Sequence, residues 1–372
     1  MRSIQFGKSL FLNVIGFVII FPAISTADQR WFVEIPQVAG TNSCTSTGIS
    51  GDGKTVLGYC DTPFTRTTYR WTADAGLVPF SSNIKDARAA SFDGSVIVGI
   101  VGQHAMRWTA ATGPMDLGAI PSTASSTAQA VSSDGSVIVG LGNSLSISGN
   151  GYLWTAQTGM SLLPLLPGTT STSPNSISAD GQTIAGNTRI GSNSNAIRWT
   201  ATDGITNIGT LSPSPFSYSQ TNGMSGDGST IIGVSNGRPF RWSQATGMLA
   251  IPAGFFGNAS GNAYSASYDG SMIVGSSIDS FSPQSAFLWT SQAGTKTIQQ
   301  ILGPFVPSGW QLTNANGMSA DGQTIVGSGS FGGQTRAWVA HIPEPGSTTF
   351  WLSATLIIVV LKRNGRPSRN AT

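Results

Sequence analysis

Apolar and polar positions alternate in short runs between residues 44 and 341, and one such pattern occurs seven times. Each copy begins with Ser-x-Asp-Gly and continues into β-branched residues that end at a glycine, as in SSDGSVIVG at 132–140. Asp-Gly followed by such a run is typical of a hairpin turn and the strand after it. The seven turn aspartates are Asp52, Asp93, Asp134, Asp180, Asp227, Asp269 and Asp321.

A tryptophan with polar neighbours follows each turn aspartate after 15 to 20 residues. Alternation places the indole on one face of a strand and its neighbours on the other. This regular placement predicts packing between repeats, and a platform for stacking carbohydrate is the alternative. Five of the tryptophans have an arginine one or two positions earlier, which we expect to bond the turn aspartates. The seven tryptophans are Trp71, Trp108, Trp154, Trp199, Trp242, Trp289 and Trp338.

The length of the repeat predicts the fold. Successive turn aspartates are 41, 41, 46, 47, 42 and 52 residues apart. A further signature, a glycine with Leu or Ile four positions later, supplies a fourth strand to each complete copy. Four strands in a repeat of this length is the size of a β-propeller blade. The sequence therefore predicts an all-β, seven-bladed β-propeller over residues 28–342, and a β-solenoid with shorter, more regular coils is the alternative.

Both ends of the repeat array indicate a closed ring. The seventh copy lacks its fourth strand, and an unassigned strand at 31–36 precedes the first turn. Pairing the two would leave no open sheet edge at the seam, so we expect the N-terminal strand to complete the last blade. Cys44 and Cys60 are placed about symmetrically around the first turn, which predicts a disulfide in an exported protein.

The two ends of the chain are predicted to be targeting segments. Residues 1–27 combine two basic residues, an apolar run at 10–21 and a small-residue cleavage site, which is typical of a secretory signal peptide. Residues 343–372 combine Pro-Glu-Pro, an uncharged segment at 348–361 and a basic tail. This order predicts a C-terminal membrane helix with its tail in the cytoplasm, although about 20 residues are usual for a span. A simple membrane anchor is the alternative.

Composition excludes one class of partner. Only 9% of the residues are charged, against roughly 25% in an average soluble domain. Of the 19 basic residues, six lie in the two targeting segments, which leaves 13 against 16 acidic residues in the whole chain. The net charge of +3 therefore comes from the targeting segments and does not indicate nucleic-acid binding.

Two resemblances follow from these motifs. The C-terminal segment resembles the PEP-CTERM sorting signal that an exosortase reads in Gram-negative bacteria, with Pro343, Glu344 and Pro345 as its motif. The repeats resemble the extracellular HAF repeat, whose His-Ala-Phe string has its nearest forms here at 104–106, 195–197 and 285–287. The resemblance implies a secreted or surface protein, with an exosortase as a partner in sorting, and it implies no established activity.

The turn aspartates could bind metal or act in catalysis, but structural turns are favoured. A Ca²⁺ site needs six to eight oxygen ligands, and each copy has a single carboxylate. The string also resembles the Asp-box of sialidases, which is itself a structural turn. A glycosidase needs two facing carboxylates, and no such motif is present. We therefore predict no catalytic, metal or cofactor site.

The predicted function is non-enzymatic. We expect a propeller displayed at the cell envelope, on the surface or outside a Gram-negative bacterium, with a structural or binding role in the envelope or exopolysaccharide matrix. Exopolysaccharide or another surface protein would be its partner, and the membrane would hold it through the C-terminal helix. Trp310, in the longest interval between turns, is the candidate ligand contact. A polysaccharide-active hydrolase or lyase and a passive spacer are the alternatives.

Overall fold

The computed structural model describes residues 29–121, 123–143, 150–252, 260–279 and 282–343. Residues 30–344 form one compact unit. The predicted signal peptide lies outside the described residues, as does the predicted sorting segment apart from Pro343.

The compact unit is built from antiparallel strands, as the alternation of apolar and polar residues predicts. Five separate sheets have four strands each. The first two contain β2 (Ser43–Ile49), β3 (Val56–Asp61), β4 (Arg66–Thr72) and β5 (Gly76–Pro79), then β6 (Ile84–Ala90), β7 (Val96–Val101), β8 (His104–Thr109) and β9 (Gly113–Asp116). The next two contain β18 (Ser219–Met224), β19 (Ile231–Ser235), β20 (Arg238–Ser243) and β21 (Gly247–Ala250), then β22 (Ser260–Ala266), β23 (Met272–Asp279), β24 (Ser282–Thr290) and β25 (Gly294–Thr297).

The fifth four-stranded sheet combines both ends of the repeat array, and a sixth sheet is twice as wide. The fifth has the order β1 (Trp31–Glu34), β28 (Gln334–His341), β27 (Thr324–Phe331) and β26 (Trp310–Met318). The sixth has eight strands, β10 (Ser125–Val131), β11 (Val137–Asn143), β12 (Asn150–Thr155), β13 (Gly159–Leu162), β14 (Thr172–Ile177), β15 (Thr183–Ile190), β16 (Asn193–Thr200) and β17 (Gly204–Asn207).

The sheets correct the predicted number of blades. The described residues contain five separate four-stranded blades and one eight-stranded sheet, so the prediction of a seven-bladed propeller was wrong. The third and fourth repeats share a sheet because β12 and β14 pair in parallel through Asn150 and Thr172. This single residue pair carries the hydrogen bonding across what the sequence pattern suggested was a boundary between blades.

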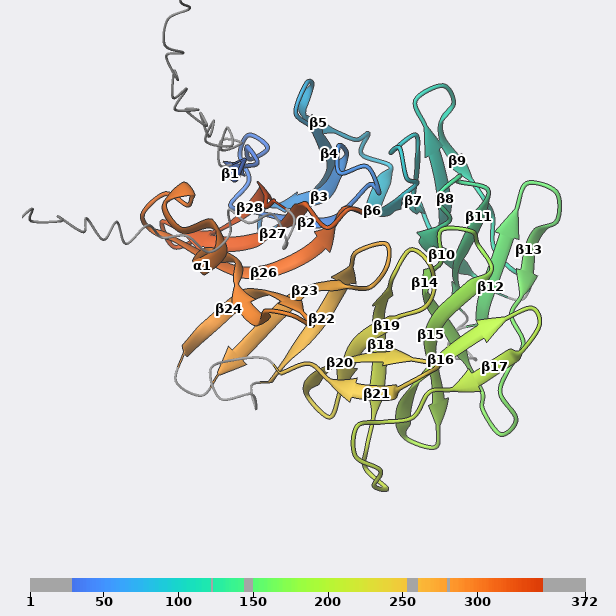
Figure 1. Cartoon of the computed structure of the whole chain (residues 1–372). Coiled ribbons are helices and arrows are strands. Elements are labelled where there is room, and N and C mark those ends of the chain that lie inside the picture. The colour runs from blue at the N-terminus through green and yellow to red at the C-terminus, as the bar shows by residue number, and fades with distance from the viewer. Residues whose placement is uncertain (1–28, 122, 144–149, 253–259, 280–281, 344–372) are drawn as a thin grey trace, which may run out of the picture. The chain divides into compact units, whose positions relative to one another are not determined.

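The first strand of each repeat is the innermost. In Figure 1, β2, β6, β10, β14, β18, β22 and β26 surround the middle of the view, and β5, β9, β13, β17 and β21 lie farther out. In a meander of four strands, the first and third turns lie at one end of the strands, and the other connections lie at the opposite end. All the Ser-x-Asp-Gly turns therefore share one face, which we call the turn face, and the longer connections share the opposite loop face.

The N-terminal strand closes the seam, as its sequence predicted. β1 pairs antiparallel with β28, and Trp31 lies opposite His341. Beyond the strand, Ile35 donates its N–H to the carbonyl of Ala337 at 2.9 Å. Arg336 donates to the Glu34 carboxylate at 3.0 Å. The edge of the last sheet is thus covered by residues about 300 positions away in the chain.

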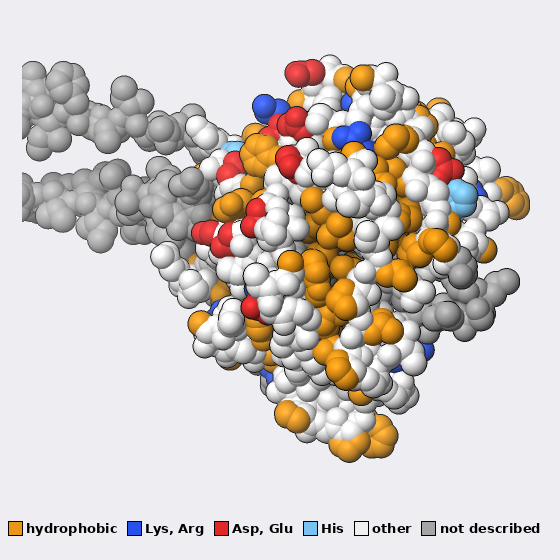
Figure 2. Space-filling model, turned by 90° about the vertical axis from the view of Figure 1, so that its right-hand side faces the viewer, with side chains coloured by type: hydrophobic (Ala, Val, Ile, Leu, Met, Phe, Trp, Pro, Cys, Tyr) orange, Lys and Arg blue, Asp and Glu red, His pale blue; other side chains and the backbone are white. Residues whose placement is uncertain are grey.

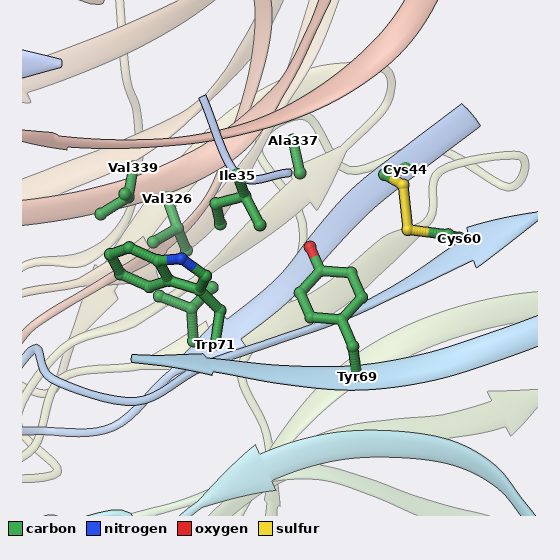
Figure 3. Packing of buried hydrophobic residues seen from close by; sticks show 9 residues of the cluster. Ile35, Cys44, Cys60, Tyr69, Trp71, Val326, Ala337 and Val339 are labelled. Atoms are coloured by element: carbon green, nitrogen blue, oxygen red, sulfur yellow. A yellow bond between two sulfur atoms is a disulfide. The ribbon is translucent and has the colours of Figure 1, made fainter. Parts of the chain in front are cut away.

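A hydrophobic cluster lies beneath the seam. Ile35 is fully buried and packs with Trp71 of the first repeat and Val339 of the last (Figure 3). The same cluster contains Cys44 and Cys60, which are direct partners across β2 and β3 and form the predicted disulfide.

The predicted C-terminal membrane helix is not borne out. Within the described residues, no helix is long and apolar enough to cross a membrane. Helical structure there is confined to α1 (Ile298–Leu302) and the short 3₁₀ helix η1 (Gly303–Phe305), both in the connection before β26. From residue 344 onward, the predicted segment lies outside the described residues.

Truncation of the buried seam residue should weaken the whole fold. We expect Ile35→Ala to lower the free energy of unfolding by about 2–5 kcal/mol, because it opens a cavity between the first and last repeats. Val33→Ala is the matched control, because Val33 lies two residues earlier in β1, is 40% exposed and should change stability by less than about 1 kcal/mol. Denaturant unfolding measures both, and equal effects would contradict the role of Ile35.

Removal of the disulfide should also destabilise the protein. Cys44 and Cys60 are 16 positions apart, and a closed loop of that size stabilises a fold by about 3 kcal/mol in the chain-entropy description. We expect a reductant to lower the melting temperature of the wild type and to leave a Cys44→Ala/Cys60→Ala variant unchanged. Two free thiols in the oxidised, denatured wild type would contradict the bond.

Candidate functional site: the central channel

The seven Ser-x-Asp-Gly segments form one kind of hydrogen-bonded turn. In the third repeat, Ser132 Oγ donates to Asp134 Oδ1 at 2.6 Å and accepts from the N–H of Val137 at 3.0 Å. Gly135 adopts a φ of 72°, and a Cβ there would lie 2.5 Å from Val96 of the preceding repeat. The equivalent serines are all buried, namely Ser50, Ser91, Ser132, Ser178, Ser225, Ser267 and Ser319.

Backbone hydrogen bonds link the turns into a closed ring. At each turn, the aspartate or the residue before it donates its N–H to the carbonyl that precedes the aspartate of the next repeat, over 2.7 to 3.0 Å. The seven bonds run from Asp52 to Phe92, Phe92 to Ser133, Ser133 to Ala179, Ala179 to Gly226, Asp227 to Tyr268, Tyr268 to Ala320 and Ala320 to Gly51. The turns therefore fix the positions of neighbouring repeats as well as the hairpins.

The turn also controls the charge of its carboxylate. Hydrogen bonds from Ser132 Oγ and then from the N–H of Ser136 lower the pKa of Asp134. The pKa of Asp93 is lowered mainly by the N–H of Ser95, and that of Asp180 mainly by the hydroxyl of Ser178. A general acid or base at neutral pH needs a pKa near 7, so these shifts favour a structural anion. The described residues contain no group of three or more His, Cys, Asp or Glu arranged to hold a metal.

A second ring of side chains lies five positions before the turn aspartates. Each of its members sits at a β-bulge, where the register between the first and second strands shifts. A bulge leaves one residue out of the ladder and redirects its side chain. The members of this bulge ring are Thr47, Arg88, Gln129, Asn175, Asn222, Tyr264 and Asn316.

Four members of the bulge ring bind the next repeat in the same way. Each donates to the backbone carbonyl that precedes the bulge of its neighbour. The bonds run from Asn175 to Thr221 at 2.7 Å, Asn222 to Ala263 at 3.0 Å, Asn316 to Ser46 at 2.8 Å and Thr47 to Ala87 at 3.1 Å. Arg88 instead donates to the side-chain oxygen of Gln129. The described inner strands are thus tied together around the channel by side chains as well as by turns.

The bulge ring lines two hollows of the central channel. The larger, about 520 Å³, reaches the turn face and is also lined by the residues one and three positions before the turn aspartates. The smaller, about 480 Å³, is lined by the members of the bulge ring other than Arg88 and by Thr45 and Ser46. At the turn-face mouth, Phe92 and Tyr268 are 47% and 51% exposed. An apolar ring follows inside, formed by Ile49, Ala90, Val131, Ile177, Met224, Ala266 and Met318.

Six of the predicted tryptophans occupy one structural position. Each lies opposite the residue four positions after the turn aspartate, as Trp71 lies opposite Val56. Each also belongs to or packs against a hydrophobic cluster, and the cluster that contains Trp71 also includes residues of the last repeat. Packing between repeats is therefore their role, and the alternative of an exposed stacking platform was wrong for these residues.

The seventh tryptophan occupies a different position. Ala340 lies opposite Ile325, where the other repeats have tryptophan, and Trp338 lies two residues earlier, opposite Gly327. The equivalent residue in the first repeat is Tyr69. Trp338 is fully buried, so its place in the core was predicted correctly and its alignment with the other tryptophans was wrong.

Trp310 is not an exposed ligand contact. It is 5% exposed, and its ring stacks on Phe331 with the centroids 5.3 Å apart. Phe32 of the closing strand meets it edge-on at 5.1 Å. Trp310 begins β26 within reach of the N-terminal strand, so the fold uses it to anchor the seam and the prediction that a ligand contacts it was wrong.

Three of the arginines beside the tryptophans contact groups other than the turn aspartates. The Cζ atoms of Arg70 and Arg241 lie 5.2 and 5.0 Å from the ring centroids of Trp108 and Trp289, each in the next repeat. Arg198 pairs with Asp203 at 3.0 Å. The two cation–π contacts add attraction between repeats of about 0.5–1 kcal/mol each where the pair is exposed.

The bulge ring was missed in the sequence because its members share a position and no residue type. The only available signal was the recurrence of a polar residue five positions before each turn aspartate. The predicted sorting motif is not tested by the fold, because Glu344 and Pro345 lie outside the described residues.

The fold is shared with proteins of known structure. No protein-family profile and no curated protein sequence matches this chain. It is similar to an oligogalacturonate lyase in complex with manganese, with a TM-score of 0.56 and 14% identity over 85% of this chain and 98% of that one. An oligogalacturonate lyase from Vibrio parahaemolyticus is similar with a TM-score of 0.56 and 12% identity, over 84% of this chain and 94% of that one. The β-propeller domain of Myceliophteria thermophila Cps50 (Swd1) is similar with a TM-score of 0.54 and 12% identity, over 83% of this chain and 99% of that one. At these identities the similarity shows a β-propeller fold alone.

The buried turn serines should matter for stability. We expect Ser132→Ala to lower the free energy of unfolding by about 1–3 kcal/mol, because it leaves a buried N–H without its partner and removes a bond to Asp134. Ser133→Ala is the matched control, because Ser133 takes part in the ring through its backbone N–H and carbonyl. Thermal unfolding compares the two, and a loss as large for Ser133→Ala would argue against the side-chain bonds.

Proposed function

We propose that this protein is an exported, non-enzymatic β-propeller that binds a polysaccharide of the cell surface or matrix in its central channel. The observation that supports this most directly is the chemistry of the channel. Amide and hydroxyl side chains of the bulge ring adjoin an apolar ring, and Phe92 and Tyr268 stand at the mouth. Amides and hydroxyls match the hydroxyl groups of sugars, and exposed aromatic rings offer a flat apolar surface for a sugar ring. A volume of about 520 Å³ also falls within the range of roughly 300–1,000 Å³ for small-molecule sites.

The carboxylates of the channel support binding over hydrolysis. Glycoside hydrolysis generally needs two carboxyl groups that flank the scissile bond. Among the described residues that line the larger hollow, Asp86 carries the one carboxylate, and it is paired with Arg88 at 2.8 Å. Two of the structurally similar proteins are named oligogalacturonate lyases, so a lyase reaction is the alternative that the experiment below includes.

The surface and the disulfide support export and a weakly charged partner. Figure 2 shows the side of the propeller that bears β13 and β17, where hydrophobic side chains gather through the middle and charged ones are sparse. The Cys44–Cys60 disulfide is typical of proteins that fold outside the cytoplasm. We propose that an exosortase-type system sorts the chain through Pro343, Glu344 and Pro345, so that the propeller is displayed at the envelope or surface of a Gram-negative bacterium.

Retention on the host's own polysaccharide tests this function. We expect the purified propeller to be retained on immobilised exopolysaccharide from the bacterium that produces it, and we expect a Phe92→Ala/Tyr268→Ala variant to elute earlier, because it lacks both exposed rings at the mouth. Phe64→Ala/Phe216→Ala is the matched control, since Phe64 and Phe216 are 94% and 88% exposed on loop-face connections. Release of shortened or unsaturated oligosaccharides would indicate an enzyme, and passage of the wild type without delay would indicate a spacer.

A further inference from the structure

One segment of the channel departs from the repeat pattern. At the bulge position, Arg88 is charged, while the other six repeats have Thr, Gln, Asn or Tyr. Seven positions before the turn aspartate, Asp86 is charged, and the other repeats have Thr, Ser, Gln or Asn. Both substitutions lie in β6, so one repeat introduces a full ion pair into a ring that is otherwise uncharged.

The two charged side chains contact each other and the next repeat. Arg88 Nε donates to Asp86 Oδ2 at 2.8 Å, and another nitrogen of its guanidinium donates to Gln129 Oε1. The side chains of Arg88 and Asp86 are 32% and 21% exposed. Both line the larger hollow of the channel, so a molecule in that hollow can reach them.

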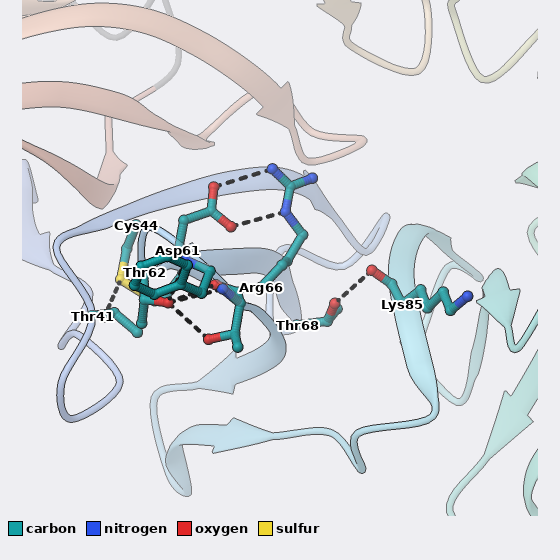
Figure 4. A network of polar contacts seen from close by, with 10 residues as sticks. Thr41, Cys44, Asp61, Thr62, Arg66, Thr68 and Lys85 are labelled. Atoms are coloured by element: carbon teal, nitrogen blue, oxygen red, sulfur yellow. Dashed lines mark hydrogen bonds and ion pairs between the residues drawn. A yellow bond between two sulfur atoms is a disulfide. The ribbon is translucent and has the colours of Figure 1, made fainter.

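The preceding repeat adds Arg66 and Tyr59 to the lining of the same hollow, and Arg66 is paired with Asp61 beside it. Arg66 binds both carboxylate oxygens of Asp61, at 2.9 and 3.1 Å (Figure 4). Its Cζ lies 3.6 Å from the centroid of Tyr59. Arg66 and Tyr59 line the larger hollow together with Asp86 and Arg88. A hydrogen bond of 3.2 Å from Thr68 to the carbonyl of Lys85 joins β4, which carries Arg66, to β6, which carries Asp86 and Arg88.

The two ion pairs have no net charge, and together they offer both hydrogen-bond donors and hydrogen-bond acceptors. Two guanidiniums and two carboxylates sum to zero, so the group has little net attraction for a charged polymer. Guanidiniums donate and carboxylates accept, so the group can engage both the oxygen and the hydrogen of neighbouring hydroxyls. An uncharged sugar with adjacent hydroxyl groups carries this combination.

From these contacts we infer that Asp86, Arg88, Arg66 and Tyr59 form a subsite for an uncharged sugar unit of a polysaccharide. The inference rests on the proposed function and narrows its ligand to neutral polymers. Arg88 and Arg66 donate to the sugar hydroxyls, Asp86 accepts from them, and the nearby aromatic side chain of Tyr59 contributes apolar contact. The balanced charge selects against uronic acids and sulfated sugars, whose anionic groups would meet the Asp86 carboxylate in the hollow and an Arg66 guanidinium that is already paired with Asp61.

The test uses the host polysaccharide separated by anion exchange into a neutral and an acidic pool. We expect the wild type to bind the neutral pool, with an affinity that changes less than about twofold between low and high salt, because no net charge is screened. The double variant Asp86→Thr/Arg88→Asn replaces the ion pair with residues found at these positions in other repeats and leaves neither charge unpaired. We expect it to bind the neutral pool about tenfold more weakly.

Arg198→Asn is the matched control, because Arg198 forms an arginine–aspartate pair in a different sheet and should bind like the wild type. Melting temperatures confirm that each variant is folded. If the wild type binds neither pool, the proposed function itself fails. If the wild type binds and the double variant binds equally well, the subsite is wrong and the proposed function stands. Salt-dependent preference for the acidic pool would also overturn the neutral ligand.

Discussion

The hydrogen bond between a buried serine and the aspartate two residues later is the interaction on which the rest of this structure depends. In each repeat it fixes a turn that brings the first and second strands together, and the same turn exposes a backbone N–H and a carbonyl toward its neighbours. Because all seven turns are alike, those groups meet in a closed cycle from Asp52 to Gly51. Deeper in the channel, side chains of the bulge ring also donate hydrogen bonds to the backbone of the next repeat. A lone aspartate per repeat is sufficient for this task, because one carboxylate accepts the hydrogen bonds that hold the turn.

Within each repeat, the residues that stabilise the ring are different from the residues that face the channel. The positions that the repeats share, such as the turn serines and the glycines, are occupied by bonds within and between repeats. The positions that vary, such as Arg88, Gln129 and Tyr264 in the bulge ring, face the channel. A ligand in the channel would therefore meet different chemistry on each side, although the scaffold around it is repetitive. That division is consistent with loops and channel linings carrying function on a rigid framework.

The sequence was informative where a local pattern determines the contact. Ser132, Asp134 and Gly135 predict their own turn, and the missing fourth strand of the last repeat predicted the pairing at the seam. Prediction was wrong where the contact depends on the packing of distant segments. Trp310 could not be assigned to the seam because Phe32 and Phe331 come to it only in the folded ring. The eight-stranded sheet depends on one pair, Asn150 and Thr172, that no turn signal marks. The sequence pattern matched Trp338 to the tryptophans of the other repeats, but Ala340 occupies that position in the fold. The spacing gave a warning, because Ala337 separates Trp338 from Arg336, whereas in four other copies the arginine directly precedes the tryptophan.

The pairing of β1 with β28 has a consequence for the order of events during biogenesis. The closing strand is among the first parts of the compact unit to be synthesised, and its partner is the last, so the ring cannot close until nearly the whole chain is available. Contacts of such long sequence separation form slowly, because a large loop must be closed before they contribute. Until then, β1 has no partner strand, and the ring closes only after the C-terminal repeat has been made.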